Sequence, residues 1–278
     1  MSFKSPKDTV SAVEGIGCTK ANLSWDKLLI LGFLAGAFIA FGGFLAIIVG
    51  KGVPNLDPGL QKLLFGGVFP VGLMLVVIAG AELFTGNTAC VIPAVMSGKA
   101  RWSGLLRNWV LAYIGNLAGS IFVAYFLAYL TGVFNDAPYL GAVVTIAANK
   151  VKPDIFLQLF LKGIGCNWLV CLAVWIGISS DDITGKILGI WWPIMAFVTL
   201  GLEHSIANMF FIPLGIFYRA NMIMAGLPDV PVVTWGQFFI TNLVPVTLGN
   251  IIGGSFFVGF IYWWVYGSRA EKACAEKK

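Results

Sequence analysis

The chain is poor in charged residues and lacks the short motifs that mark many enzymes. Only 11% of its 278 residues are Asp, Glu, Lys or Arg, whereas a soluble domain carries about 25%. A P-loop, a Gly-x-Gly-x-x-Gly motif, a His-Glu-x-x-His pair and a Cys-x-x-Cys pair are all missing. These absences argue against a nucleotide-driven pump and a motif-borne metal site. We expect no metal and no cofactor, and we interpret the cysteines as buried thiols.

Long apolar runs fill most of the chain. Hydrophobic residues make up 58% of it, and the mean hydropathy is +0.87. A membrane core of ~30 Å needs ~20 apolar residues per helix. The sequence therefore predicts an all-α membrane protein with six transmembrane helices. The runs are residues 28–50, 63–98, 105–134, 155–180, 187–218 and 238–267.

The soluble part of the chain is small. Residues 1–27 are polar and mixed in charge and do not resemble a cleavable signal. Ser5 and Pro6 are expected to start a short amphipathic helix in this segment. We divide the chain into this N-terminal segment, a channel domain over 28–267 and a tail over 268–278. When both termini are placed inside, the inside segments carry twelve Lys and Arg residues and the outside segments carry six. Because the cytoplasmic segments of membrane proteins are enriched in Lys and Arg, we expect both termini to lie in the cytoplasm. We expect the protein to lie in the cell membrane. The net charge of +5 gives no indication of nucleic-acid binding.

Two of the apolar runs are interrupted by one pattern, Gly-x-Glu-x4-Asn, at residues 80–87 and 201–208. A carboxylate inside an apolar segment is costly, and a break exposes backbone groups that hydrocarbon cannot satisfy. We expect Gly86 and Gly201 to supply the necessary backbone freedom. Because the breaks correspond, we favour a pathway lined by two half-helices over two packed kinks. A half-helix N-terminus suits an anion.

The two halves of the chain repeat each other. The third and sixth runs share one pattern, at Asn108-x6-Gly115-Asn116-x2-Gly119 and at Asn242-x6-Gly249-Asn250-x2-Gly253. The repeats, residues 28–134 and 155–267, hold three spans each. An odd number of spans makes the second repeat enter the membrane from the opposite side. The sequence therefore predicts a 3+3 inverted repeat with helices 2 and 5 broken and a site near the midplane.

Symmetric and unique residues are expected to have different roles. Glu82 and Asn87 in one break correspond to Glu203 and Asn208 in the other, which suits a scaffold that is needed twice. The glutamates are expected to accept hydrogen bonds from freed N–H groups, and a proton-carrying role is the alternative. His204 is the only histidine in the chain. It is the predicted working group, because imidazole donates, accepts or shuttles a proton near neutral pH; a satisfied core histidine is the alternative.

Four stretches, residues 81–87, 166–175, 201–210 and 242–254, resemble the signature motifs of the formate/nitrite transporters. The resemblance covers nearly the whole chain after residue 6. It implies an aquaporin-like fold and a homopentamer with one pore in each protomer, although the Asn-Pro-Ala motifs of true aquaporins are missing.

The resemblance also implies roles for single residues. His204 faces Thr85 in the pore, Asn167 lines the pore, and Lys150 stands in the outer vestibule, with Lys152 as the alternative. The residues that correspond to two hydrophobic constrictions are Phe69, Leu73, Leu83 and Phe197, with a contribution from Phe210.

We predict a transporter or channel for small monovalent weak-acid anions, formate first, with nitrite or hydrosulfide as the alternative. Its expected partners are the anion, protons and membrane lipid. In our hypothesis Lys150 draws in the anion, desolvation raises its proton affinity, and His204 helps to protonate it. An anion channel with His204 as a hydrogen-bond donor is the rival mechanism. A membrane enzyme would need a second catalytic group or a metal near His204, so we expect no enzyme.

Overall fold

The computed structural model describes residues 3–53, 55–152, 155–226 and 232–267, so the predicted tail over 268–278 lies outside the described residues. In this part of the chain the fold is all-helical apart from one isolated β-bridge between Phe3 and Ser180. The all-α prediction with six apolar spans is confirmed. The segments long and apolar enough to cross a membrane are Trp25–Lys51, Pro58–Gly80, Trp102–Tyr129, Phe156–Ser179, Ser205–Met224 and Gln237–Tyr266.

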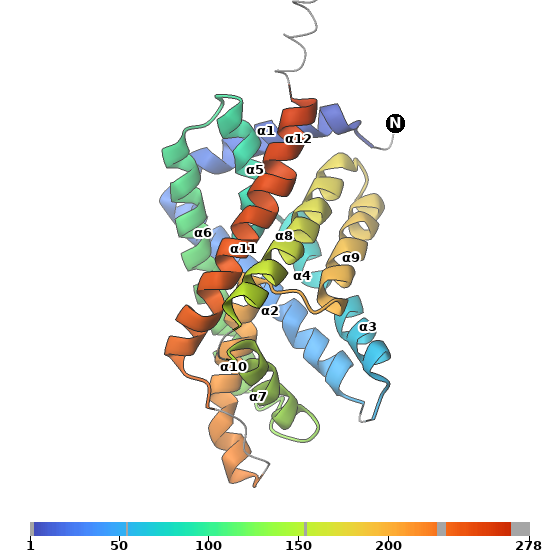
Figure 1. The fold of residues 1–278 in the computed structure, drawn as a ribbon, viewed down its shortest axis with the longest axis vertical. Coiled ribbons are helices and arrows are strands. Elements are labelled where there is room, and N and C mark those ends of the chain that lie inside the picture. The colour runs from blue at the N-terminus through green and yellow to red at the C-terminus, as the bar shows by residue number, and fades with distance from the viewer. Residues whose placement is uncertain (1–2, 54, 153–154, 227–231, 268–278) are drawn as a thin grey trace, which may run out of the picture.

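The first half begins with a helix that lies across one end of the bundle (Figure 1). This helix, α1, starts where the sequence predicted, since the Ser5 hydroxyl accepts the Asp8 N–H at 3.2 Å and Val10 and Val13 are buried. The elements of this half are α1 (Pro6–Asn22), α2 (Trp25–Lys51), α3 (Pro58–Val68), α4 (Val71–Met74), the π-helical η1 (Leu75–Gly80), α5 (Phe84–Met96), α6 (Trp102–Phe122) and the π-helical η2 (Val123–Tyr129).

The second half repeats this order upside down. Its first helix, α7, lies at the end of the bundle opposite to α1 (Figure 1). The elements are α7 (Tyr139–Lys150), α8 (Phe156–Ser179), α9 (Ile183–Thr199), α10 (Ser205–Met224), η3 (Gln237–Leu243), α11 (Val244–Gly254), η4 (Ser255–Phe260) and α12 (Ile261–Tyr266). The segment between the predicted repeats therefore contains a counterpart of α1, and each half consists of a short end helix followed by three spans.

Both breaks depend on a glycine with left-handed backbone geometry. Gly80 has φ 89° and Gly201 has φ 72°, a region that side chains with a Cβ rarely adopt. The chain then runs extended, as at Ala81 (φ −147°, ψ 164°), before the next helix starts. Gly86 lies inside α5 instead. The expectation for Gly86 was wrong, because the turn precedes the glutamate in both copies.

The glycines of the third and sixth spans allow close helix packing. A Cβ on Gly115 of α6 would lie 2.9 Å from Cα of Gly32 in α2. A Cβ on Gly249 of α11 would lie 3.1 Å from Cα of Gly163 in α8. These distances are too short for any larger residue, so α2 crosses α6 and α8 crosses α11 with their backbones in contact. The two crossings fix the frame in which the breaks are held.

Candidate functional site

The two breaks meet in the interior of the molecule. Oγ1 of Thr85, the second residue of α5, lies 2.8 Å from Nε2 of His204, the N-cap of α10. Both side chains are buried. The positive ends of two half-helices therefore converge on one hydrogen bond, an arrangement that favours a negative charge nearby.

The hydrogen bonds of His204 determine which ring nitrogen carries the proton. Nδ1 accepts the Ala207 N–H at 3.1 Å, so this nitrogen presents its lone pair. In the neutral ring the proton is then on Nε2, which donates to Thr85 Oγ1. The hydroxyl hydrogen of Thr85 is left available for another acceptor. Protonation of Nδ1 would set two N–H groups against each other and remove the cap of α10.

Asn167 in α8 hydrogen-bonds to the backbone of the helix that follows the first break. Its Nδ2 donates to the carbonyl of Thr85 at 3.2 Å, to Thr88 Oγ1 at 2.9 Å and to the carbonyl of Asn250 at 2.6 Å. The thiol of Cys171 also donates to the Thr85 carbonyl, at 3.2 Å. Asn167 Oδ1 is buried and has no partner within the described residues. The geometry fixes the backbone of Thr85 and leaves one amide oxygen open.

A buried ion pair stands beside the first break. Nζ of Lys20 in α1 lies 2.7 Å from Oε1 of Glu82, and their side chains are 18% and 7% exposed. Oε2 of Glu82 accepts from Nδ2 of Asn87 at 2.8 Å. Asn108 completes the network, with its Oδ1 accepting from Asn87 at 2.9 Å and its Nδ2 donating to the Lys20 carbonyl at 3.1 Å. The carboxylate is thus neutralised by an amine and held by two amides.

The second break repeats this network on the other side. Nζ of Lys150 in α7 lies 3.1 and 2.9 Å from the two oxygens of Glu203. Asn208 donates to Glu203 at 2.7 Å and to Asn242 at 2.8 Å, and Asn242 donates to the Lys150 carbonyl at 2.8 Å. Lys150 is therefore paired and only 17% exposed. Lys152, the alternative vestibule lysine, is exposed.

Asparagines, not the glutamates, satisfy the freed backbone groups. Oδ1 of Asn116 accepts the Phe84 N–H at 2.9 Å, and Oδ1 of Asn250 accepts the Ser205 N–H at 2.9 Å. Each amide also donates to the carbonyl of the glutamate in its break, at 2.9 and 3.0 Å. The expectation that the two carboxylates accept hydrogen bonds from the freed N–H groups was wrong. The Glu82 and Glu203 carboxylates instead accept from the lysine amines and asparagine amides described above.

Lys20, the ion-pair partner of Glu82, has no role in the predictions made from the sequence. It lies in the polar N-terminal segment, where a lysine is unremarkable by composition. A weak repeat could have found it, since α1 and α7 share one spacing: Val10-x2-Val13-x2-Ile16-x3-Lys20 and Leu140-x2-Val143-x2-Ile146-x3-Lys150.

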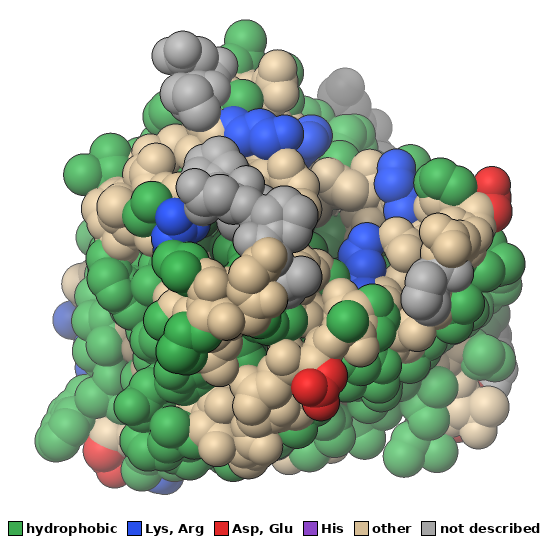
Figure 2. All heavy atoms as spheres, turned by 90° about the horizontal axis from the view of Figure 1, so that it is seen from below, with side chains coloured by type: hydrophobic (Ala, Val, Ile, Leu, Met, Phe, Trp, Pro, Cys, Tyr) green, Lys and Arg blue, Asp and Glu red, His purple; other side chains and the backbone are tan. Residues whose placement is uncertain are grey.

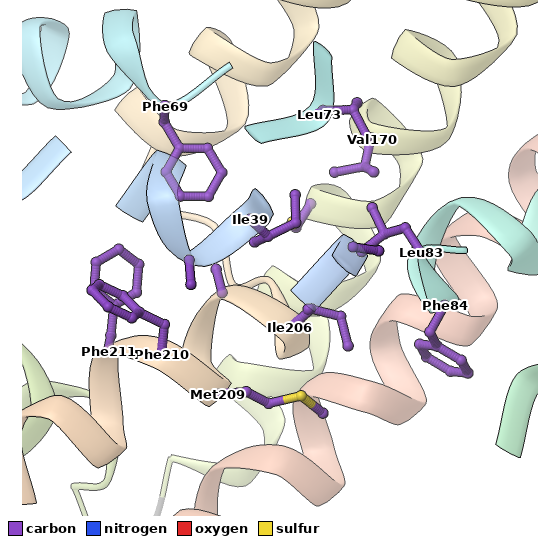
Figure 3. Packing of buried hydrophobic residues seen from close by; sticks show 14 of the residues in the cluster. Ile39, Phe69, Leu73, Leu83, Phe84, Val170, Ile206, Met209, Phe210 and Phe211 are labelled. Carbon is purple, nitrogen blue, oxygen red and sulfur yellow. The ribbon is translucent and has the colours of Figure 1, made fainter. Parts of the chain in front are cut away.

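The predicted constriction residues occupy three places. The rings of Phe69 and Phe197 pack edge to face with centroids 5.9 Å apart, and the Phe197 ring lies 5.9 Å from that of His204. Leu73 and Leu83 line the wall of a cavity on the α1 side. Phe210 lies beside Phe211 on another side of the apolar cluster (Figure 3). Its ring stacks with that of Phe44, with the two ring centroids 6.3 Å apart.

Two cavities lie toward opposite ends of the molecule. The one on the α1 side, about 430 Å³, is lined by Lys20, Glu82, Leu73 and Leu83 among others. A smaller cavity on the opposite side, about 190 Å³, is lined by Lys51, Gln61, Lys62, Phe65, Ile146 and Val198. Figure 2 views this second end and shows Lys and Arg side chains gathered around a recess. Within the described residues no three His, Cys, Asp or Glu side chains gather as metal ligands.

Comparison with known proteins places the chain among membrane transporters. Residues 7–264 match the family model described as formate/nitrite transporter. The chain is 51% identical over 280 residues to the probable formate transporter of Methanothermobacter thermautotrophicus, with 95% of this chain and 98% of that protein covered.

Two solved structures share the fold. One, an FNT family ion channel, has a TM-score of 0.82 at 33% identity, with 93% of this chain and 98% of that chain covered. The other, a pentameric formate channel with formate bound, has a TM-score of 0.77 at 37% identity, with 87% and 97% covered. These neighbours are channels, which confirms the expectation of a transport protein rather than an enzyme. The chain belongs to the formate/nitrite transporter family.

Proposed function

We propose that this protein conducts formate across the cell membrane, with both termini in the cytoplasm. A probable formate transporter at 51% identity and a pentameric formate channel with formate bound support the substrate. The pentameric neighbour also supports a homopentamer with one pore in each protomer. The bias of Lys and Arg along the chain supports the orientation.

The hydrogen bond between Thr85 and His204 carries the proposal. It lies where two half-helix N-termini converge, and one cavity lies on the α1 side and another on the α7 side of the molecule. An anion that leaves water for the apolar zone around Phe69 and Phe197 loses hydration. The Thr85 hydroxyl, whose oxygen already accepts from His204, is a donor that replaces part of that hydration.

In this mechanism His204 stays neutral and serves as a polar support. Direct protonation of the anion by Nε2 would require a new proton on Nδ1, and the bond from Ala207 opposes it. Desolvation raises the proton affinity of a weak-acid anion. The proton therefore comes from a hydronium ion of the cavity water, which is left as neutral water, and the neutral acid crosses the apolar zone.

The lysines divide into two groups. Lys20 and Lys150 are half-buried and paired with glutamates, so they hold the breaks and set the local field. Lys51 and Lys62 line the cavity on the α7 side. These two attract the anion from the outer solution, the role that the sequence reading gave to Lys150.

Formate uptake into proteoliposomes across a pH series tests the function. His204→Phe removes both the cap and the contact with Thr85, and we expect uptake to fall sharply. His204→Asn is the matched control for folding, because asparagine is also a good N-cap. Unchanged pH-dependent uptake in a folded His204→Phe variant would remove His204 from the mechanism. The same assay with nitrite, hydrosulfide and lactate tests whether formate is the preferred substrate.

A further inference from the structure

A separate cationic cavity lies at the α1 end of the molecule, outside the transport path. Its volume is about 530 Å³, and it is enclosed by the last turn of α1, the loop between α5 and α6, and the first turns of α6. Its lining residues are Ala21, Asn22, Gly98, Lys99, Ala100, Arg101, Ser103, Gly104 and Arg107. Three of these carry positive charge and none carries negative charge, so the cavity selects anions.

The three cations are placed in different ways. Nη2 of Arg107 donates to the carbonyls of Ala21 and Leu23, both at 2.9 Å, which fixes its guanidinium at one wall. Lys99 is ion-paired with the buried Glu14, but its side chain remains 49% exposed. Arg101 is exposed. A fixed guanidinium with two further cations around one hollow suits a multidentate oxyanion better than a single small anion.

The start of α6 adds backbone donors to the same wall. Arg101 is its N-cap residue, and its side chain does not cap the helix. The helix dipole is positive at this end, where the Gly104 N–H donates to the Arg101 carbonyl at 3.0 Å and the N–H groups before it precede the first turn of hydrogen bonds. The hydroxyl of Ser103 is a further donor in the lining. These donors match the several oxygens of a phosphate group.

Aromatic residues place the cavity at the depth of lipid headgroups. Trp102, the first residue of α6, is 59% exposed, and Trp25, the first residue of α2, is 66% exposed. Exposed tryptophans at the ends of membrane helices mark the boundary between hydrocarbon and water. A basic hollow at this level on the cytoplasmic side suits an anionic headgroup.

We propose that this cavity binds a phosphate group, presented by an anionic phospholipid of the adjoining leaflet or carried by a soluble phosphate ester. Arg101 and Lys99 attract the group, and Arg107 together with the start of α6 orients it. Binding does not depend on the proposed formate transport, because none of these residues lines the two cavities described with the candidate site.

Native mass spectrometry of the full-length protein in a phosphate-free detergent tests the site. The probes are phosphatidylglycerol, zwitterionic phosphatidylcholine and glycerol 3-phosphate. We expect one phosphatidylglycerol per chain to bind at least about tenfold more tightly than phosphatidylcholine, and Arg101→Gln to weaken it about tenfold. Arg101→Lys should retain most of the affinity. Lys27→Gln is the matched control, because Lys27 is exposed near the same end but does not line the cavity.

The probes separate the two sources of phosphate. Binding of glycerol 3-phosphate that depends on Arg101 would identify a soluble ester. Binding of phosphatidylglycerol that depends on Arg101, without displacement by millimolar glycerol 3-phosphate, would identify the lipid. If neither probe responds to Arg101→Gln more than to Lys27→Gln, the proposal is wrong.

Discussion

The hydroxyl oxygen of Thr85 lies 2.8 Å from Nε2 of His204, and this bond joins the first turns of two half-helices from opposite halves of the chain. His204 also caps α10 through Nδ1. One imidazole therefore completes a helix and connects the repeats, and both bonds favour the same neutral form of the ring. The unique residue of the second break thus fixes the hydroxyl of the first.

Thr85→Val should lower formate flux by about tenfold, because it removes the proposed donor without changing the shape of the side chain. The factor corresponds to one hydrogen bond of about 1.4 kcal/mol. Thr85→Ser retains the hydroxyl and should stay close to the parent. The measurement is initial uptake into proteoliposomes at equal protein density. Equal flux in Thr85→Val and the parent would show that the hydroxyl does not contact the anion.

Asn116→Ala should destabilise the fold. The substitution leaves the Phe84 N–H and the carbonyls of Gly32 and Glu82 without their partner. Each buried unpaired group costs about 1–3 kcal/mol. Thermal unfolding of the detergent-solubilised protein measures the loss, with Asn149→Ala as the control at an exposed asparagine. A similar melting temperature for the two variants would mean that Asn116 does not hold the break.

Lys20 and Glu82 should be energetically coupled. Lys20→Met leaves a buried carboxylate without its amine, and Glu82→Gln leaves a half-buried amine without its carboxylate. We expect Lys20→Met to cost about 3 kcal/mol, Glu82→Gln to cost less because water reaches the amine, and the double variant to cost less than their sum. Unfolding of the four proteins forms a double-mutant cycle. Additive losses would argue that the two charges are stabilised separately.

The double variant Lys51→Gln with Lys62→Gln should raise the KM for uptake from the α7 side by about two- to tenfold at low salt, with little change in the maximal rate. High ionic strength should reduce the difference, because these side chains line an open cavity and their field is screened. Lys152→Gln is the control at an exposed lysine of the same end. A larger effect of Lys152→Gln would return the capture role to the loop before α8.

Phe3 and Lys4 attach the N-terminal strap, as we call this segment, to residues at the end of α8, and this attachment should not change with pH in the physiological range. Phe3 pairs with Ser180, the Lys4 N–H donates to the Ser179 carbonyl at 2.8 Å, and the Lys4 amine is ion-paired with Asp181. The hydrogen bond and charge of Lys4 lower the pKa of Asp181 below its ordinary value of 3.8. A lowered folded-state pKa gives a contribution that is complete above the ordinary value and is lost as the pH falls through the lowered one.

The strap should therefore stay closed from about pH 5 to pH 8. Asp181→Asn should loosen it at neutral pH, and a lower protection factor of the Lys4 amide is the readout, although the backbone contacts of Phe3 and Lys4 remain. A protection factor that falls between pH 7 and pH 5 in the parent protein would contradict this assignment.

The breaks and the family were readable from the sequence because their signals lie within single segments. Glu82 and Glu203 stand out since a carboxylate in an apolar run is costly wherever the chain folds. The turn glycine was misplaced at Gly86 because the pattern marks a break without showing at which residue the helix ends. Only the backbone of Gly80 decides that.

The partners of the glutamates were not readable in the same way. Lys20 and Glu82 are 62 residues apart, and Lys150 and Glu203 are 53 apart, so no local pattern joins them. The sequence therefore assigned anion capture to Lys150 and gave no role to Lys20.

The sequence by itself determined the six apolar spans, the inverted repeat, the two breaks and the family, because hydrophobic length and repeated motifs are properties of the chain in one dimension. The tertiary structure alone decided how each buried polar group is satisfied. Asn116 and Asn250 cap the breaks, two lysines pair with the glutamates, and His204 is hydrogen-bonded to Thr85. The physical reason is that burial makes an unpaired polar group costly. The folded chain supplies the partner from whichever helix places a donor or acceptor atom within about 3 Å of that group.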